Sequence, residues 1–448
     1  MKPRILLVNP PIYDFSAYDF WLKPYGMLRV AGYLRGKADF QLFDFLDRAD
    51  ARVPPGRYRS DPWGRGEFYS EIAAKPRSFA DVPRQFRRFG LPRPIFRDYL
   101  QLTEPCDFAL LQAGMTYWYL GLREVITDIR SAWPATKIVL GGVYATLCPS
   151  HASSLGADFV LDGTDLSSLW RYLRIAPDER ALPLWDLYPS STTGVLKLAD
   201  GCPFRCTYCS VPQVYPKFQA RPLDQSLAEL KSLADLGVKH VVFYDDALLF
   251  KPDELLHPFL RAVVRRQSPA NFHTPNALNA RFISRELADL LIGAGFKNIY
   301  LGFESSAFSW QKKTGGKVYS DELARAVEHL LRAGAEPRQL HAYLIVGHPK
   351  GDEQEVAASM EFANSLGIRV MLSEFSPLPG TPDGELCRRW VDLDEPLSHN
   401  KTAFAIRMLG HSGINCLKNQ ANALNRGLLA GAHGRPSKTL PDGAANLV

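Results

Sequence analysis

Three cysteines stand close enough in the sequence to share one metal centre. The chain has seven cysteines, at positions 106, 148, 202, 206, 209, 387 and 416, and Cys202, Cys206 and Cys209 follow a Cys-x3-Cys-x2-Cys spacing. Cubane iron–sulfur clusters are normally held by four cysteines. Three ligands from one tight loop would leave one iron open to a substrate or cosubstrate, by the logic of catalytic metal sites. The spacing therefore predicts an iron–sulfur cluster with one open corner.

Two other interpretations of the trio stay open. It could belong to a structural zinc site with a distant cysteine or histidine as fourth ligand, or be three unrelated buried thiols. The position favours the cluster, because the loop follows the apolar segment VLKLAD, residues 195–200, at the end where β/α barrels place their chemistry. An odd number of cysteines also argues against a disulfide framework.

The segments around this loop predict a partial barrel. In four places a helical pattern ends in glycine and a strand follows at once, at Gly237, Gly295, Gly334 and Gly367, where a left-handed residue would stop each helix. With two further strands this gives six β/α units, near residues 195, 241, 273, 299, 343 and 370. Six units are too few for a closed eight-stranded barrel. We therefore expect an open barrel whose missing wall is filled by something else.

The residues before the barrel predict a second α/β unit. Five short apolar strands separated by helices lie at 4–9, 40–45, 107–112, 137–140 and 158–161. They indicate an open, doubly wound parallel sheet. Ligands of such sheets bind beyond the carboxyl ends of the strands. No G-x-G-x-x-G follows the first strand, so a nicotinamide dinucleotide site is not indicated.

The segment 51–94 interrupts this sheet with many Pro, Arg and aromatic residues. Residues 51–100 hold eleven Lys and Arg against five Asp and Glu, which matches the net charge of +6 of the whole chain. A long insertion of this kind is usually functional or disordered, and its arginines could hold a phosphate or carboxylate or form a solvated face. Because the remaining charge is balanced, a nucleic-acid-binding surface is not expected.

The composition, 46% hydrophobic and 22% charged, is that of a globular protein and excludes a disordered or fibrous chain. No run of eighteen uncharged apolar residues indicates a transmembrane helix. The apolar stretch at the N-terminus is too short for a secretory signal. We therefore expect a cytoplasmic protein.

The cysteine spacing, with the aromatic Tyr208 before the last cysteine, resembles the signature of the radical S-adenosylmethionine (radical SAM) superfamily over residues 191 to about 382. The resemblance implies a partial (β/α)6 barrel and a [4Fe-4S] cluster on the three cysteines. It also implies S-adenosylmethionine bound at the fourth iron and cleaved to a 5′-deoxyadenosyl radical, with an electron donor such as flavodoxin or ferredoxin. The cosubstrate-binding positions it implies are Tyr208, Asp245, Asp246, Asn276, Arg281, Glu304 and Gly347. Each has a structural alternative, such as a carboxylate that caps the next helix.

The N-terminal section, with VNPP, PYGMLRVAGYLR and IVLGGVYATLCPSH, is similar to the vitamin B12-binding domain fused to many radical SAM enzymes. Two features depart from B12-binding patterns. Gly163-Thr164-Asp165 replaces a final G-E-G-E, and the D-x-H-x-x-G motif of free-standing B12 domains is absent. A Rossmann-like domain that has lost cobalamin is therefore the alternative. The cobalamin contacts that the similarity implies are Pro10, Tyr13, Thr116, Tyr117, Trp118, Gly141, Gly142, Tyr144 and Gly163.

Together these resemblances predict a cobalamin-dependent radical SAM enzyme that methylates an unactivated carbon of an unknown small-molecule or peptide substrate. The alternatives are cyclisation, rearrangement or oxidation without methyl transfer, or a metal-stabilised module whose basic insert binds RNA or a phosphorylated partner. The expected domains are a Rossmann-like cobalamin-binding-type domain at 1–185, including the insert 51–94, and the radical SAM barrel at 191–382. A C-terminal helical region with a disordered tail is expected at 383–448.

Overall fold

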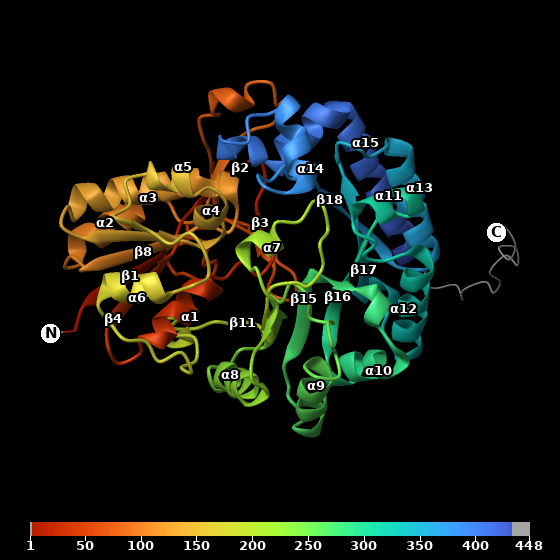
Figure 1. Cartoon of the computed structure of the whole chain (residues 1–448), viewed down its shortest axis with the longest axis horizontal. Helices are drawn as coiled ribbons and strands as arrows, with labels where there is room; N and C mark the ends of the chain where they lie inside the picture. Colours follow the sequence, from red (N-terminus) through yellow and green to blue (C-terminus); the bar gives the residue numbers. More distant parts are fainter. Residues whose placement is uncertain (1, 432–448) are drawn as a thin grey trace, which may run out of the picture.

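The computed structural model describes residues 2–431, which form two α/β halves side by side (Figure 1). The first half is built on a five-stranded parallel sheet with the order β10-β9-β8-β1-β4. Its strands are β1 (Arg4–Asn9), β4 (Asp39–Asp44), β8 (Phe108–Gln112), β9 (Lys137–Gly141) and β10 (Phe159–Val160). In chain order this is the flavodoxin-like arrangement, whose topological switch point lies between the ends of β1 and β8.

Helices cover both faces of this sheet, which confirms the doubly wound prediction. On one face, Ile5 and Leu7 of β1 pack with α1 (Tyr25–Tyr33) and α6 (Ser167–Leu173). On the other face, Leu6 and Val8 join the core that contains α2 (Arg93–Leu102) and α3 (Tyr119–Ala132). A strand buried on both faces reads as a continuous apolar run. Two short helices, α4 (Gly142–Leu147) and α5 (Pro149–Ser153), follow β9.

The second half is the predicted open barrel. Six parallel strands pair in chain order: β11 (Thr193–Leu196), β14 (His240–Phe243), β15 (Asn271–Asn279), β16 (Phe296–Glu304), β17 (Leu340–Val346) and β18 (Arg369–Glu374). Helices line their outer side (Figure 1): α8 (Leu223–Asp235), α9 (Leu256–Arg265), α10 (Arg285–Ala294), α11 (Phe308–Thr314), α12 (Ser320–Arg332) and α13 (Glu353–Ser365). The four predicted helix-stop glycines all have left-handed φ values between 79° and 100°, as a glycine C-terminal cap requires.

The first half supplies the filling of the barrel interior. Trp21 stacks on His273 of β15 with ring centroids 4.6 Å apart, and Trp63 lies 5.7 Å from the same ring. Arg65 donates to the hydroxyl of Tyr300 on β16 and pairs with Asp61. Side chains from residues 21–65 of the first half therefore fill the space that a closed barrel would enclose with its own strands.

The basic insert is an ordered part of the core, with short strands β5 (Gly66–Glu67), β6 (Ser70–Ile72) and β7 (Arg87–Phe89). Its arginines are mostly paired with carboxylates of the chain itself. The buried Arg88 guanidinium lies 2.7 Å from Glu124, and Arg93 lies 2.8 Å from Asp128. These two arginines therefore hold carboxylates of the chain itself, whereas Arg57 and Arg77 are exposed.

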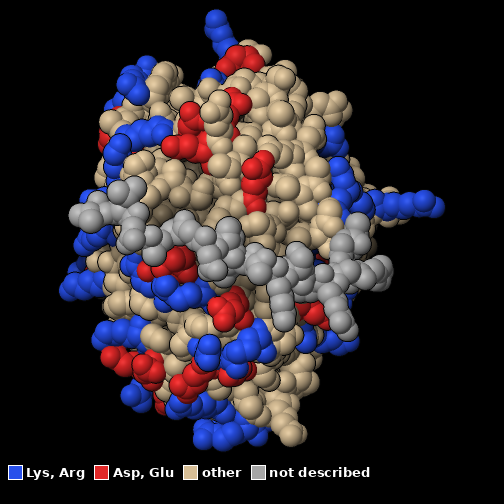
Figure 2. Space-filling view, turned by 90° about the vertical axis from the view of Figure 1, so that its right-hand side faces the viewer, with Lys and Arg blue, Asp and Glu red and all other residues tan. Residues whose placement is uncertain are grey.

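The C-terminal helix α15 (Lys401–Gly431) lies within the region expected to be helical and contacts α13 and β18. It is broken at Gly410, whose φ is 71°. The tail predicted to be disordered lies outside the described residues. No helix within residues 2–431 is long and apolar enough to cross a membrane. On the face turned to the viewer in Figure 2, Lys and Arg lie among Asp and Glu in the lower part, whereas much of the upper part is uncharged.

Candidate active site

A cavity of about 1440 Å³ lies where the two halves meet. One wall comes from the switch point of the first sheet, with residues 9–12 after β1 and 112–115 after β8. The opposite wall comes from the loop after β11 and the carboxyl ends of the other barrel strands. Both folds place their ligands at these strand ends. The cavity thus joins the two sites that the sequence predicted separately.

The cysteine loop lies between β12 (Ala199–Asp200) and α7 (Val211–Val214). Its first turn requires glycine, because Gly201 has a φ of 82° and a Cβ there would lie 2.5 Å from the carbonyl oxygen of Lys217. All three predicted cysteines are free and line the cavity. Burial raises the pKa of each thiol, and that of Cys209 to about 12. Among residues 2–431, no three His, Cys, Asp or Glu side chains converge on one point as ligands of a single ion would.

Glu304 and Lys317 form an ion pair beside the thiols. Glu304 closes β16 with a φ of 69°, a left-handed value that is uncommon for non-glycine residues. Its Oε1 lies 3.2 Å from Nζ of Lys317, and both residues line the cavity. Burial alone would lower the pKa of Lys317, but Glu304 and the thiols of Cys206 and Cys209 raise it. An ammonium group is thereby kept charged next to the cysteine loop.

Lys317 is a site residue that the sequence analysis missed. The available signal was the pair Gly315-Gly316 directly before it, which interrupts the helical pattern after the Glu304 strand. Gly302 makes room for the amine, because a Cβ at that position would lie 2.7 Å from Lys317 Nζ.

The two aspartates after β14 have different surroundings. Asp245 accepts hydrogen bonds from the backbone N–H groups of Leu198 (2.9 Å) and Ala199 (2.7 Å) and does not line the cavity. Burial raises its pKa to about 7. Asp246 lines the cavity, and its buried Oδ2 has no hydrogen-bond partner in the described structure, with Lys197 Nζ 3.9 Å away. Oδ2 of Asp245 is likewise buried without a hydrogen-bond partner among residues 2–431, so what distinguishes Asp246 is its place in the cavity lining.

The remaining predicted cosubstrate positions fall into two groups. Tyr208 and Asn276 line the cavity, with the Tyr208 ring 6.1 Å from that of Trp310. Arg281 lies outside the lining, where its guanidinium binds Glu322 at 2.8 Å. Gly347 also lies outside it and packs closely against Ala405 of α15.

On the sheet side, four of the nine predicted cobalamin contacts line the cavity: Pro10, Trp118, Gly142 and Gly163. Gly142 has a φ of 86°. The other five point elsewhere or lie behind this wall, namely Tyr13, Thr116, Tyr117, Gly141 and Tyr144. Of these, Tyr13 donates to Glu124 at 2.6 Å, and the Tyr144 hydroxyl lies 2.5 Å from His151 Nδ1.

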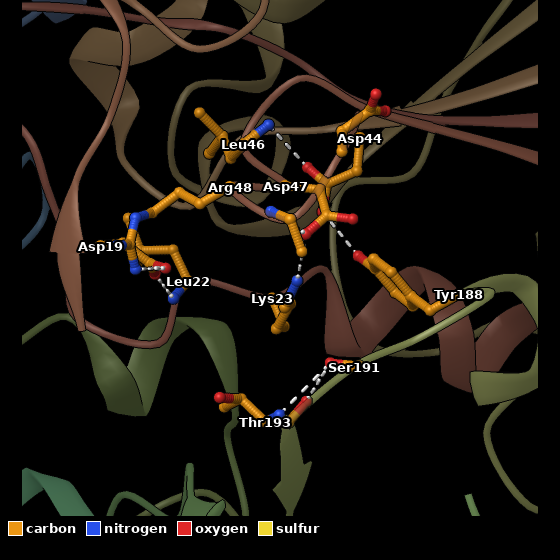
Figure 3. Close-up of polar contacts among 12 residues, drawn as sticks. Asp19, Leu22, Lys23, Asp44, Leu46, Asp47, Arg48, Tyr188, Ser191 and Thr193 are labelled. Carbon is orange, nitrogen blue, oxygen red and sulfur yellow. Dashed lines mark hydrogen bonds and ion pairs between the residues drawn. The ribbon is translucent and has the colours of Figure 1, made fainter. Parts of the chain in front are cut away.

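Charged residues at the base of the sheet wall are already neutralised. Figure 3 shows Lys23 among the acidic residues near the end of β4, with Nζ 3.2 Å from Asp47. Burial raises the pKa of Asp44 to about 6, although its carboxylate accepts hydrogen bonds from Leu46 N–H and the Tyr188 hydroxyl. Nearby, Asp19 pairs with Arg48 at 3.4 Å. This cluster supports the junction and offers no free charge.

A second ion-pair group ties the sheet half to the cysteine loop. Asp200, two residues before Cys202, binds Arg29 of α1 at 2.6 Å and Lys197 at 2.8 Å. The first cysteine is therefore anchored to a helix of the other half.

The donor set fits a cluster and its cosubstrate. Three free thiols from one loop are the ligands that iron–sulfur clusters use. The unpartnered Asp246 oxygen and the Lys317 ammonium supply one acceptor and one cation beside them, which match the amino and carboxylate groups of an amino acid.

Comparison with known proteins agrees with this description. Residues 196–363 match the family model of the radical SAM superfamily. The threonylcarbamoyladenosine tRNA methylthiotransferase MtaB of Thermotoga maritima is 24% identical over 58% of this chain and 64% of its own. An uncharacterized methyltransferase of Pyrococcus horikoshii, PH0819, is 25% identical over 46% of this chain and 45% of its own. The alignments thus span less than two thirds of these relatives.

Two solved structures share the fold over most of the chain. The radical S-adenosylmethionine methyltransferase TsrM from Kitasatospora setae, with cobalamin and a [4Fe-4S] cluster bound, gives a TM-score of 0.63 at 16% identity, covering 95% of this chain and 91% of that one. The cobalamin-dependent S-adenosylmethionine radical enzyme OxsB, with aqua-cobalamin bound, gives a TM-score of 0.54 at 13% identity, covering 90% and 57%.

Proposed function

Because the chain is a radical SAM protein with an N-terminal B12-binding-like domain, we propose that it is a cobalamin-dependent radical SAM methyltransferase. The observation that supports this function is the shared cavity, in which the cysteine loop and the switch point of the first sheet face one another. A methyl carrier on one wall and a radical generator on the other would both reach a substrate held between them. The substrate is a small molecule or peptide of unassigned structure.

On the barrel wall, Cys202, Cys206 and Cys209 would hold a [4Fe-4S] cluster. Asp246 would accept a hydrogen bond from the amino group of S-adenosylmethionine, and Lys317 would pair with its carboxylate. When bound, the cluster and its cosubstrate supply a 5′-deoxyadenosyl radical, and cobalamin supplies a transferable methyl group. A flavodoxin- or ferredoxin-type protein would deliver the electron.

The chain's own residues would orient these groups and exclude water. Tyr208 offers an aromatic face at the cavity wall, and Asn276 is held by its donation to the Tyr244 carbonyl oxygen at 3.0 Å. Glu304 fixes the Lys317 ammonium. On the sheet wall, Pro10, Gly142 and Gly163 present little side-chain bulk, so a large flat corrin could approach the backbone. Cofactors of this kind carry the difficult chemistry, and the protein contributes position and shielding.

The test is a combined cofactor and isotope experiment. Anaerobically prepared protein should contain about four irons per chain together with one corrinoid. S-adenosylmethionine with a labelled methyl group should then yield a labelled product and 5′-deoxyadenosine. Formation of 5′-deoxyadenosine without label transfer would favour cyclisation, rearrangement or oxidation instead. Protein that holds zinc and no iron would contradict the proposal as a whole.

A further inference from the structure

The cysteine loop is held from behind by a residue that follows the last barrel strand. Thr207 lies between Cys206 and Cys209, and its hydroxyl donates a hydrogen bond to Oδ2 of Asp383. The backbone N–H of Asp383 in turn donates to the carbonyl oxygen of Thr207 at 3.0 Å. Side chain and backbone of one residue thus clamp both sides of Thr207.

Asp383 is fully buried, and its carboxylate is saturated by charged and polar donors. Nε2 of His348 lies 3.1 Å from the same Oδ2 that Thr207 reaches, and Nζ of Lys350 lies 3.1 Å from Oδ1. Burial by itself would raise the pKa of Asp383, but the bonds from His348, Thr207 and Lys350 outweigh it and lower the pKa to about 2. The Asp383 carboxylate is therefore ionised.

The chain around Asp383 leaves the carboxylate little freedom. Asp383 lies in the short helix α14 (Pro382–Glu385), whose N-cap Thr381 accepts from Gly384 N–H at 3.0 Å. A Cβ at Gly384 would lie 1.8 Å from the carbonyl oxygen of Leu378. Close packing of this turn fixes the position of the acceptor before any cofactor binds.

The end of α11 (Phe308–Thr314) also contacts the cysteine loop. Thr207 N–H donates to the carbonyl oxygen of Thr314 at 3.1 Å. Gly315 follows with a φ of 120°, and a Cβ there would lie 3.1 Å from Cα of Cys206. The loop is thus supported on two sides, and the hydrogen bond that the Thr207 hydroxyl donates to Asp383 can set the direction of the thiols.

We propose that Asp383 is a positioning residue that acts through Thr207 to fix Cys206 and Cys209 for cluster binding. This inference rests on the proposed function, because it takes the three cysteines to be cluster ligands. Partners behind metal ligands orient those ligands, and their loss costs about 10–100-fold in metal affinity. Asp383 would touch neither cluster nor cosubstrate.

The experiment compares cluster retention in four reconstituted full-length variants with that of the wild type. Asp383→Asn removes the charge, and Thr207→Val removes the hydroxyl while keeping the shape. Thr207→Ser keeps the hydroxyl, and Lys350→Met removes an Asp383 partner that does not touch the loop. Iron loss to a chelator and the electron paramagnetic resonance spectrum of the reduced cluster are measured for each.

We expect Asp383→Asn and Thr207→Val to lose iron about 10–100-fold faster than the wild type and to share an altered spectrum. Thr207→Ser and Lys350→Met should stay close to the wild type in both readouts. Circular dichroism melting of the unloaded proteins identifies a variant that fails to fold, and Thr207→Val then decides alone. Wild-type retention and spectrum in Thr207→Val would overturn the inference, whereas a wild type that binds no cluster would overturn the proposed function instead.

Discussion

The two walls of the cavity differ in how they would hold a ligand. The barrel wall presents reactive side chains: three free thiols, the unpartnered Asp246 oxygen and the Glu304–Lys317 pair. The sheet wall presents backbone, small residues and Trp118, together with charged side chains that are already paired, such as Lys23 with Asp47 and Arg65 with Asp61. The barrel wall therefore offers unpaired donor and acceptor atoms to a ligand, and the sheet wall offers mainly a surface of matching shape.

The same contrast appears in backbone strain. On the barrel wall a charged residue, Glu304, adopts a left-handed φ of 69°, which is costly for a side chain with a Cβ. On the sheet wall the left-handed position is Gly142, which adopts it without that cost. Of these two left-handed positions on the cavity walls, only Glu304 carries that cost, and its side chain is the one that holds Lys317. The following predictions separate the two walls.

The largest effect is expected from the thiols. Cys209→Ser should abolish cluster binding and all cleavage of S-adenosylmethionine, because a hydroxyl does not replace a thiolate ligand of iron. The corrinoid content, which depends on the other wall, should stay at the wild-type level. Iron, sulfide and corrinoid analyses of one sample measure both. Cys416→Ser is the control, since Cys416 is exposed and lies outside the cavity; equal iron in both variants would contradict the assignment.

Next in size is the loss of the cavity ammonium. Lys317→Met should weaken S-adenosylmethionine binding to the reconstituted protein by about 10–100-fold, the range for one charge-assisted hydrogen bond of about 1.5–3 kcal/mol. Equilibrium dialysis measures the dissociation constant. Lys312→Met, at an exposed position on α11, is the matched control. Unchanged affinity in Lys317→Met would remove this residue from the cosubstrate site.

A smaller effect, a loss of corrinoid and not of iron, is expected from a substitution on the sheet wall. Gly142→Ala should cost about 1–2 kcal/mol of backbone strain, and its Cβ would lie 3.2 Å from that of Gln112. We expect reduced corrinoid content with iron unchanged. Gly156→Ala carries the same strain at the same φ of 86°, but no atom lies within 4 Å of its added Cβ. Equal corrinoid loss in both variants would mean that strain, and not the cavity wall, is responsible.

The sequence predicted the barrel wall better than the sheet wall, for a physical reason. Three cysteines at fixed spacing identify their own chemistry, and a glycine after a helix predicts a turn wherever it lies. Contacts made through backbone and shape have no comparable sequence pattern. Tyr117 and Tyr144 resemble ligand-binding aromatic residues, yet both are buried behind the sheet wall. Long-range pairs were equally hidden, because nothing local connects Asp383 with Thr207 or Arg65 with Tyr300.

Each half of the molecule also has a buried carboxylate, outside the cavity lining, whose protonation should make stability depend on pH. Burial raises the pKa of Asp245 to about 7 and that of Asp44 to about 6. The folded chain therefore holds protons that the unfolded chain has already released, so the free energy of unfolding should fall as the pH rises from about 4 toward these values. A single group contributes at most about 1.4 kcal/mol per pH unit. Asp245→Asn should flatten the decline up to about pH 7, and Asp44→Asn only up to about pH 6. Urea unfolding of the cofactor-free proteins at several pH values measures both slopes, and identical profiles for the two variants would contradict the difference in pKa between Asp245 and Asp44.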